Sequence, residues 1–106
     1  MMNPEWKKKW LEALRSGKYV QGQNVLRSDG NRYCCLGVLC DLQGEGAWDA
    51  KNPGRPAGLN TNYTYLTGPL CLAFGLSDKE QCTLSDLNDV AEAPFSEIAN
   101  WIEANL

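Results

Sequence analysis

The chain contains no histidine among its 106 residues. A Ser-His-Asp triad, a Cys-His dyad, a histidine-ligated zinc enzyme and a base deaminase of the His-x-Glu type each need a histidine. A phosphate loop of the Walker type is also absent, because Gly-Lys is never followed by serine or threonine. These absences exclude most familiar hydrolase designs from a site built by one chain.

The sequence also lacks long apolar runs and a surplus of basic residues. No segment approaches the ~20 apolar residues of a membrane span, and the N-terminal residues lack the apolar run of a signal peptide. The sequence therefore predicts a cytoplasmic protein with no membrane partner. The formal net charge is -3, and the one basic cluster, at residues 7–9, is flanked by Glu5 and Glu12. This pattern predicts no binding of extended nucleic acid.

The composition is that of a folded protein, with 43% apolar and 22% charged residues. A chain of this length supports one modest core, so we expect a single domain over residues 1–106. The local patterns predict the α+β class, as a mainly helical small domain with a short antiparallel β-hairpin.

Capping residues and apolar periodicity locate the first and last helices. Asn3 and Pro4 are suited to open a helix over residues 4–16. Pro94 opens a helix near the C-terminus. Its apolar residues recur at helical spacing and form one stripe: Phe95, Ile98, Ala99, Ile102 and Leu106.

Between these, a short apolar helix is predicted over residues 69–74, with Gly75 as its stop signal. Ser77 and Glu80 have the spacing of a capping box. Thr83 and Asp86 repeat that spacing, which predicts a separate short helix around residues 84–88.

The β-structure is predicted before the cysteine-rich segment. Residues 20–27 are β-compatible, and the turn signal at residues 28–31 predicts a hairpin of residues 20–27 against residues 32–34. A regular strand would place Gln21, Gln23 and Arg27 on one face, which is either solvated or the floor of a pocket. Residues 63–66 are compatible with a further short strand.

The segment RYCCLGVLC, residues 32–40, holds three of the five cysteines. We expect a short buried helix over residues 35–43, in which Gly37 allows another backbone to approach closely. The cysteines have three interpretations: a zinc site, a nucleophile at Cys35, or small core residues. The spacing of the cysteines is poor for zinc and no histidine can serve as a base, so the core interpretation is favoured.

Residues 44–62 form a predicted loop with four glycines and two prolines, and long loops often carry function. In or just after it, aromatic rings that can stack on a base occur with donors for phosphate: Trp48, Arg55, Asn60, Tyr63 and Tyr65. The alternative, slightly favoured, is that Trp48 and a tyrosine pin the loop to the core. Asn88 and Asp89 are either a polar ligand pair or, preferably, a helix terminator.

The ordered segments WLEALRSGKYVQGQNVLR, YCCLGVLCDL, LSDLND and PFSEIANWIE resemble a family of small, largely uncharacterised bacteriophage and prophage proteins. The similarity extends over nearly the whole chain except residues 44–62, with YCCLGVLCDL as the family marker. The resemblance supplies no catalytic residues. It implies an accessory protein in the cytosol of an infected bacterium, and such proteins are often counter-defence factors that inhibit a host protein or sequester a nucleotide-derived immune signal.

The leading hypothesis is therefore a non-enzymatic anti-defence protein that sequesters a small nucleotide-like ligand, with no cofactor and no metal. Its predicted contacts come from the hairpin, the loop and the LSDLND segment: Gln21, Arg27, Trp48, Arg55, Asn60, Tyr63, Tyr65, Asn88 and Asp89. A homo-oligomer fits this hypothesis, because a short chain gains a composite pocket by assembling.

Two other function classes are weighed against this hypothesis. A protein-protein inhibitor would use an exposed aromatic patch around Trp48 or Trp101. An enzyme that degrades a cyclic nucleotide signal would use carboxylates such as Asp86 and Asp89 with a metal or a cysteine.

Overall fold

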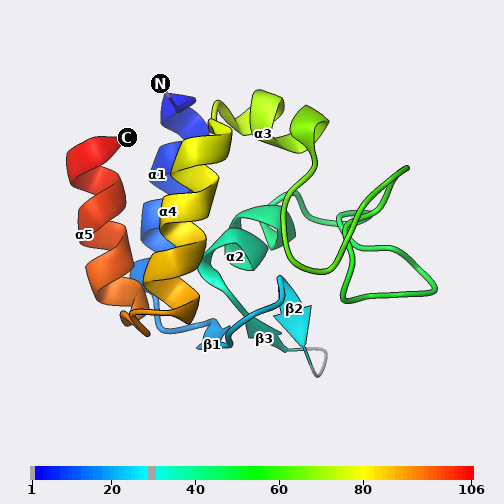
Figure 1. Ribbon diagram of the computed structural model, residues 1–106, viewed down its shortest axis with the longest axis horizontal. Helices are drawn as coiled ribbons and strands as arrows, with labels where there is room; N and C mark the ends of the chain where they lie inside the picture. The colour runs from blue at the N-terminus through cyan, green and yellow to red at the C-terminus, as the bar shows by residue number, and fades with distance from the viewer. Residues whose placement is uncertain (1, 29–30) are drawn as a thin grey trace.

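Five helices and a three-stranded sheet make up the described chain, residues 2–28 and 31–106 of the computed structural model (Figure 1). The helices are α1 (Pro4–Arg15), α2 (Cys35–Asp41), α3 (Gly68–Phe74), α4 (Asp78–Asp89) and α5 (Phe95–Asn105). They pack around one core, and the predicted mainly helical α+β fold is confirmed. Within the described ranges, none of these helices has the length and apolarity needed to cross a bilayer.

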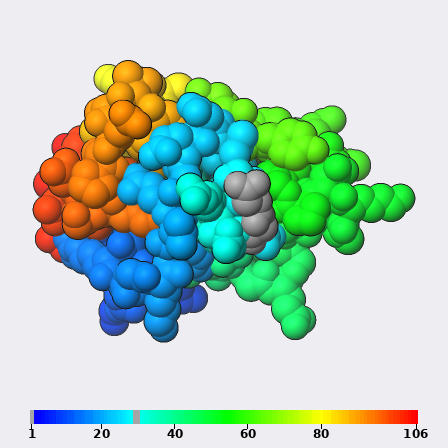
Figure 2. Space-filling view, turned by 90° about the horizontal axis from the view of Figure 1, so that it is seen from below, coloured from blue at the N-terminus to red at the C-terminus, as the bar shows by residue number. Residues whose placement is uncertain are grey.

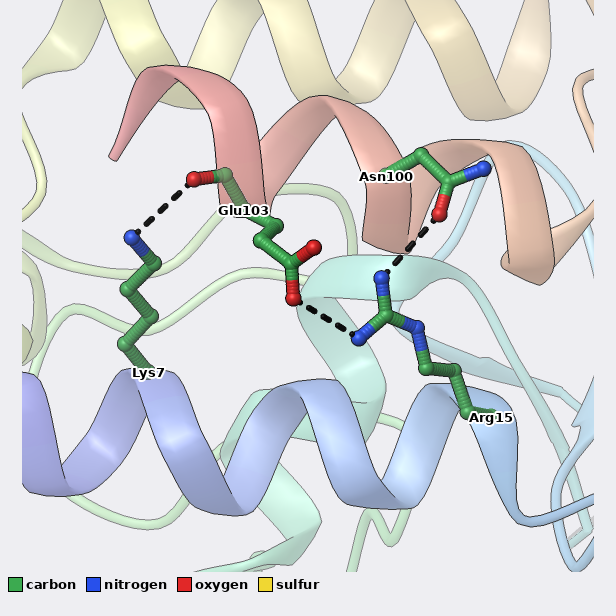
Figure 3. A network of polar contacts seen from close by, with 4 residues as sticks. All are labelled: Lys7, Arg15, Asn100 and Glu103. Carbon is green, nitrogen blue, oxygen red and sulfur yellow. Dashed lines mark hydrogen bonds and ion pairs between the residues drawn. The ribbon is translucent and has the colours of Figure 1, made fainter.

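The first and last helices lie side by side (Figure 1). The side chain of Asn3 accepts hydrogen bonds from the N–H groups of Glu5 and Trp6, at 2.9 and 3.2 Å, which confirms the predicted cap of α1. In α5, which Pro94 precedes, the predicted apolar stripe is buried. The two helices are joined at their surfaces, where Arg15 donates to Glu103 and to Asn100, each at 3.0 Å (Figure 3).

Helix α2 is the centre of the core, as the cysteine-rich segment predicts. Every residue from Cys35 to Cys40 is buried, and the helix ends at Asp41, two residues before the predicted end. Gly37 faces the backbone of Leu26, and a β-carbon at residue 37 would overlap the Leu26 carbonyl oxygen. The predicted close approach of another backbone is therefore confirmed.

The end of α3 and the start of α4 follow their predicted signals. Gly75 adopts a left-handed conformation with φ 79° and ends α3. Ser77 and Glu80 form both hydrogen bonds of a capping box, at 2.9 and 3.1 Å. The predicted separate helix at residues 84–88 is wrong, because α4 is continuous and the Thr83 hydroxyl donates to the Lys79 carbonyl inside it.

The sheet contains β1 (Val20–Gln21), β2 (Arg27–Ser28) and β3 (Arg32–Tyr33), in the order β1-β3-β2. β2 and β3 are antiparallel, which is the predicted hairpin, whereas β1 pairs with β3 in parallel. The predicted turn covers residues 28–31, of which residues 29–30 lie outside the described residues.

The continuous strand predicted over residues 20–27 is wrong. The chain leaves the sheet after Gln21, Asn24 takes a positive φ of 72°, and its N–H donates to Asp89 at 2.9 Å. Gln21, Gln23 and Arg27 therefore do not share the face of one strand.

Residues 44–62 contain no helix or strand, as predicted, and one isolated bridge joins Trp48 to Pro56. Residues 63–66 form no strand, contrary to the prediction. The side-chain oxygen of Asn62 accepts hydrogen bonds from the N–H groups of Thr64 and Tyr65 in a local turn. The Tyr63 carbonyl accepts a hydrogen bond from the Leu26 N–H, next to the hairpin, at 2.7 Å.

Candidate functional site

Arg27, Trp48, Arg55 and Tyr63 come together where the loop meets the sheet. This end of the molecule projects away from the helices (Figure 1). The guanidinium carbon of Arg27 lies 5.3 Å from the centre of the Trp48 ring, and a Gly54 β-carbon would touch both the Arg27 carbonyl and the Tyr63 ring. The bridge between Trp48 and Pro56 brings Arg55 to the same region.

Trp48 fixes the loop to helix α2 through Asp41. One carboxylate oxygen of Asp41 accepts from the Trp48 indole N–H at 2.9 Å, and the other accepts from the Tyr19 hydroxyl at 2.7 Å. Tyr33 lies between the rings of Tyr19 and Trp48, with centroid distances of 5.1 and 6.1 Å. Trp48 is therefore an anchor of the loop, which agrees with the favoured alternative for this residue.

Contacts within this cluster change the pKa values of its tyrosines. Burial and the neighbouring Asp41 carboxylate raise the pKa of both Tyr19 and Tyr33. The Arg27 guanidinium lies over the Tyr33 ring as well, at 5.7 Å, and donates to the Pro53 carbonyl at 3.4 Å. Arg27 therefore connects the sheet to the loop while it contributes positive charge to this end of the molecule.

Arg55 and Tyr63 are the more accessible members of the group. Arg55 pairs with Asp49 at 3.5 Å, and its side chain keeps 33% of its surface exposed. The N–H groups of Asn52 and Lys51 lower the pKa of Asp49. Tyr63 is 46% exposed, and its hydroxyl donates to the Asn52 side chain at 3.4 Å. Tyr63 and Arg55 thus both bond Asn52, Tyr63 through its hydroxyl and Arg55 through its backbone N–H at 3.0 Å.

Asn60 and Tyr65 lie at the surface, apart from these contacts. Tyr65 is exposed, and Asn60 is exposed with a positive φ of 58°. Both residues remain accessible candidates for contact with a ligand.

Gln21, Asn88 and Asp89 form a second cluster on the other side of the sheet region. Asn88 is fully buried, and its side-chain oxygen accepts from Gln21 at 3.0 Å and from the Cys35 N–H at 3.2 Å. Its amide nitrogen donates to Gly22 and to Asp89, each at 2.8 Å. These polar groups satisfy one another inside the protein.

The cluster shows why Asn88 does more than end a helix. Cys35 is the first residue of α2, where an N–H has no partner within the helix, and the Asn88 oxygen supplies that partner. α4 ends at Asp89, as the terminator interpretation predicts. Asn88 therefore joins α4, α2 and β1.

The cysteine thiols are core groups, with one exception. Cys34, Cys35, Cys40 and Cys71 are buried, whereas Cys82 is exposed on α4. Burial raises the pKa of Cys34 to about 11 and of Cys40 to about 12, and it raises the pKa of Cys35 and Cys71 as well. A nucleophilic thiolate at Cys35 is therefore contradicted, because a buried thiol with a raised pKa stays protonated.

Two open hollows lie on the helices. One of about 620 Å³ runs along α1 beside Glu103, and one of about 400 Å³ lies at the end of α4. The loop candidates Arg55 and Tyr63 line neither. In the described residues, no group of three or more acidic, histidine or cysteine side chains is arranged to hold a metal ion.

Sequence patterns did not identify Tyr19, Tyr33 and Asp41 as parts of the site. Asp41 carried a usable signal, because a carboxylate at the end of a fully apolar helix needs hydrogen-bond donors from elsewhere. The two tyrosines carried no signal beyond their β-compatible setting.

A domain of unknown function, DUF8296, matches residues 2–68, well over half of the chain. The chain belongs to the DUF8296 family. The matched range includes α1, the sheet, α2 and the whole loop, and it ends at the first residue of α3. No curated protein and no solved structure matches the DUF8296 chain. The match confirms a family of unknown function, whereas the predicted bacteriophage and prophage family stays a prediction.

Proposed function

We propose that this DUF8296 protein is a non-enzymatic binding protein that sequesters a small nucleotide-derived signal, as a counter-defence factor of a bacteriophage. The observation that carries the proposal is the half-exposed ring of Tyr63, which lies close to Gly54 and so to the backbone of Arg27 and of the neighbouring, partly exposed Arg55. A base can stack on such a ring, and a guanidinium suits a phosphate.

The local structure favours binding at this surface. The loop is tied to the core by the Asp41–Trp48 hydrogen bond and by the Tyr63–Leu26 hydrogen bond. Its aromatic and basic groups are thereby held in place before a ligand arrives, which lowers the entropic cost of binding. Asn60 and Tyr65 are exposed and complete the proposed contact set.

The internal contacts of other candidates favour sequestration over cleavage. Cys35 is fully buried, and the carboxylate of Asp89 accepts from the Asn24 N–H, the Asn88 amide and the Ser85 hydroxyl. The enzyme alternative would use carboxylates such as Asp86 and Asp89 with a metal or a cysteine, and of these Asp89 is already engaged inside the protein. Gln21 and Asn88 bond each other, so we remove them from the contact set and assign them to the frame of the site.

The phage origin and the cytosolic setting belong to the same proposal. They rest on the resemblance of YCCLGVLCDL and the flanking segments to phage and prophage proteins. The segment lies at residues 33–42, inside the range matched by the DUF8296 domain.

The direct test uses purified protein and a panel of cyclic and linear nucleotides. The protein is incubated with each nucleotide, separated from free ligand and heated, and the released material is identified by mass spectrometry. Recovery of the intact nucleotide supports sequestration, whereas recovery of a cleaved product supports the enzyme alternative. At about 100 times the Kd, a ligand should stabilise the protein by ~2.7 kcal/mol, which is measurable as a higher Tm.

Two variants of Tyr63 separate stacking from hydrogen bonding. Tyr63→Phe keeps the ring and should keep the affinity within about threefold, whereas Tyr63→Ala should weaken binding by ~1–3 kcal/mol. Leu72→Ala is the control, because Leu72 is 84% exposed and lies on α3, away from the loop. Equal affinities for all three variants would contradict a stacking role for Tyr63.

The second candidate is an inhibitor that binds a host protein. It is favoured by Leu59, which lies in the loop and is 91% exposed, an unusual position for a large aliphatic side chain. Trp48 is bound to Asp41 and Trp101 is half-buried, so Leu59 replaces them as the predicted anchor. If a host protein co-purifies with the tagged chain, Leu59→Ser should abolish its capture, and no nucleotide should raise the Tm.

A further inference from the structure

We propose that Asp49 is a specificity-determining residue of the ligand-binding surface. Its carboxylate is held beside the Arg55 guanidinium, and it makes this surface discriminate against a phosphate with two negative charges, as in a terminal monoester, in favour of a phosphate with one, as in a phosphodiester. The inference rests on the proposed binding of a nucleotide at Arg55, and it adds the class of nucleotide: one in which the phosphate is a diester.

The backbone holds Asp49 and Arg55 next to each other. The N–H of Asp49 donates to the carbonyl of Arg55 at 2.9 Å, and the N–H of Arg55 donates to the carbonyl of Asn52 at 3.0 Å. Residues 49–55 therefore form a closed turn. Its two ends carry side chains of opposite charge, and these form an ion pair.

The carboxylate of Asp49 is fixed inside this turn. One of its oxygens accepts hydrogen bonds from the N–H groups of Lys51 and Asn52, at 2.9 and 3.0 Å. These N–H groups also lower the pKa of Asp49, so the side chain is ionised at neutral pH. The carboxylate moves aside only by losing two hydrogen bonds, and it keeps its negative charge when a ligand approaches.

Asp49 satisfies the guanidinium of Arg55 only in part. The Nη2 atom of Arg55 lies 3.5 Å from the second carboxylate oxygen, farther than the ~2.7–2.9 Å of a strong charge-assisted hydrogen bond. The Nε atom is buried and has no hydrogen-bond partner among the described residues, which is rare for a buried donor. The guanidinium therefore keeps donor capacity for an oxygen atom from outside the chain.

The turn lies at an open end of the molecule. Figure 2 shows the chain around residues 50–60, in green, projecting at the edge opposite the C-terminal residues, in red. The side chains of Arg55 and Asp49 keep 33% and 25% of their surface exposed. A ligand from solvent can therefore contact Arg55 while Asp49 stays in place.

These two fixed charges favour one class of phosphate. Asp49 cancels much of the attraction that Arg55 alone exerts on an anion, and its repulsion doubles when the phosphate carries two charges instead of one. A dianion also loses more hydration energy than a monoanion when it leaves water. The surface therefore discriminates against terminal phosphate monoesters, which carry close to two charges at neutral pH.

Paired nucleotides test this discrimination. For each of the common bases, the Kd of the 3′,5′-cyclic nucleotide and of the 5′-monophosphate is measured by calorimetry at about pH 8, up to millimolar ligand. The wild type should bind the cyclic member of a pair more tightly. Asp49→Asn should shift the ratio of the two Kd values toward the monophosphate on the order of tenfold. Asparagine keeps the side-chain oxygen that accepts the two N–H groups, so this variant should fold.

Glu45→Gln is the matched control. It changes the net charge by the same amount, at an exposed position earlier in the loop, and it should leave the ratio as in the wild type. An equal shift in this control would mean that net charge, and not the position of Asp49, sets the ratio.

A pH series on the wild type tests the same point without a substitution. At about pH 5 the monophosphate carries close to one charge, because its second pKa is about 6. The chain has no histidine to titrate between pH 5 and pH 8, and Asp49 stays ionised. The preference for the cyclic nucleotide should therefore shrink at the lower pH.

The outcomes separate this inference from the proposed function. If nucleotides bind but the ratio is the same in the wild type and in Asp49→Asn, or is independent of pH, the role of Asp49 is wrong and nucleotide binding stands. A wild type that prefers the monophosphates overturns the assigned class of ligand. If no nucleotide of either kind binds the wild type or Asp49→Asn, both proposals are wrong.

Discussion

The carbonyl oxygen of Leu26 lies against the α-carbon of Gly37, in space that a side chain at residue 37 would need. Leu26 is itself fully buried, and its carbonyl also accepts from the Cys34 N–H at 3.3 Å. Its own N–H donates to the Tyr63 carbonyl at 2.7 Å. The segment before β2 is therefore held between the core helix α2 and the segment that follows the loop.

Gly37→Ala should destabilise the protein, although alanine favours a helix by about 1 kcal/mol over glycine. The added methyl group would overlap a backbone carbonyl, which cannot move aside as a flexible side chain can. Overpacking typically costs ~1–3 kcal/mol, so the net loss should be at least ~1 kcal/mol in urea unfolding. Gly68→Ala is the control, because a β-carbon there has open space, and its stability should be unchanged or slightly higher.

Asn88→Ala should lower the free energy of unfolding by about 3 kcal/mol. The substitution removes the partners of Gln21, the Cys35 N–H and the Gly22 carbonyl, and buried polar groups without partners are costly. Asn105→Ala, at an exposed position on α5, is the matched control and should cost less than about 0.5 kcal/mol. Similar urea midpoints for the two variants would show that the Asn88 network contributes little.

The features predicted correctly from the sequence are those that depend on near neighbours. Asn3, Gly75 and the Ser77–Glu80 pair act on backbone groups within a few residues, so their patterns are visible in a short window. Thr83 has the same local pattern but lies inside a longer amphipathic helix, whose buried face overrides it. The buried face of α4, and not the Thr83–Asp86 pattern, keeps the helix continuous past residue 83.

The incorrect predictions concern residues whose partners are distant in sequence. The chain between Gln21 and Arg27 leaves the sheet because Asn24 bonds Asp89, 65 residues away. The role of Asp41 could not be predicted, because it consists in accepting hydrogen bonds from Tyr19 and Trp48, and the three residues meet only after folding. Gln21 and Asn88 were predicted as ligand contacts, but in the folded chain their side chains hydrogen-bond each other.

Thiol labelling should distinguish Cys82 from the other cysteines. Cys82 is exposed, whereas Cys34, Cys35, Cys40 and Cys71 are buried. Ellman's reagent should therefore label one thiol rapidly in the folded protein and all five in urea. Cys82→Ala should abolish the rapid phase. Rapid labelling of a second thiol in that variant would contradict the buried positions.

The free energy of unfolding should fall as pH rises above about 9. Cys34 and Cys40 have folded pKa values of about 11 and about 12, whereas their thiols ionise near 9 in the unfolded chain. The unfolded state therefore binds fewer protons above pH 9, and stability that is complete below this pH is lost as pH rises toward 11–12. Each such thiol should contribute a loss of about 1.4 kcal/mol between about pH 8 and about pH 10.

Cys40→Ala isolates the contribution of one thiol to the decline in the free energy of unfolding with pH. Its stability should decline between pH 8 and pH 10 by about 1.4 kcal/mol less than that of the wild type, whatever the cost of the substitution at neutral pH. Parallel pH profiles for Cys40→Ala and the wild type would contradict the raised pKa of Cys40.

Asp41→Ala should release the loop while leaving the helical core folded. The substitution removes both acceptors that hold the Tyr19 hydroxyl and the Trp48 indole N–H, at an expected cost of ~1–3 kcal/mol. Because local opening exposes backbone to proteases, trypsin should cut after Lys51 faster than in the wild type. Asp86→Ala, at an exposed position on α4, is the control and should leave the cleavage rate unchanged. Equal cleavage rates for Asp41→Ala and Asp86→Ala would mean that the loop is held by its other contacts, chiefly the Tyr63–Leu26 hydrogen bond.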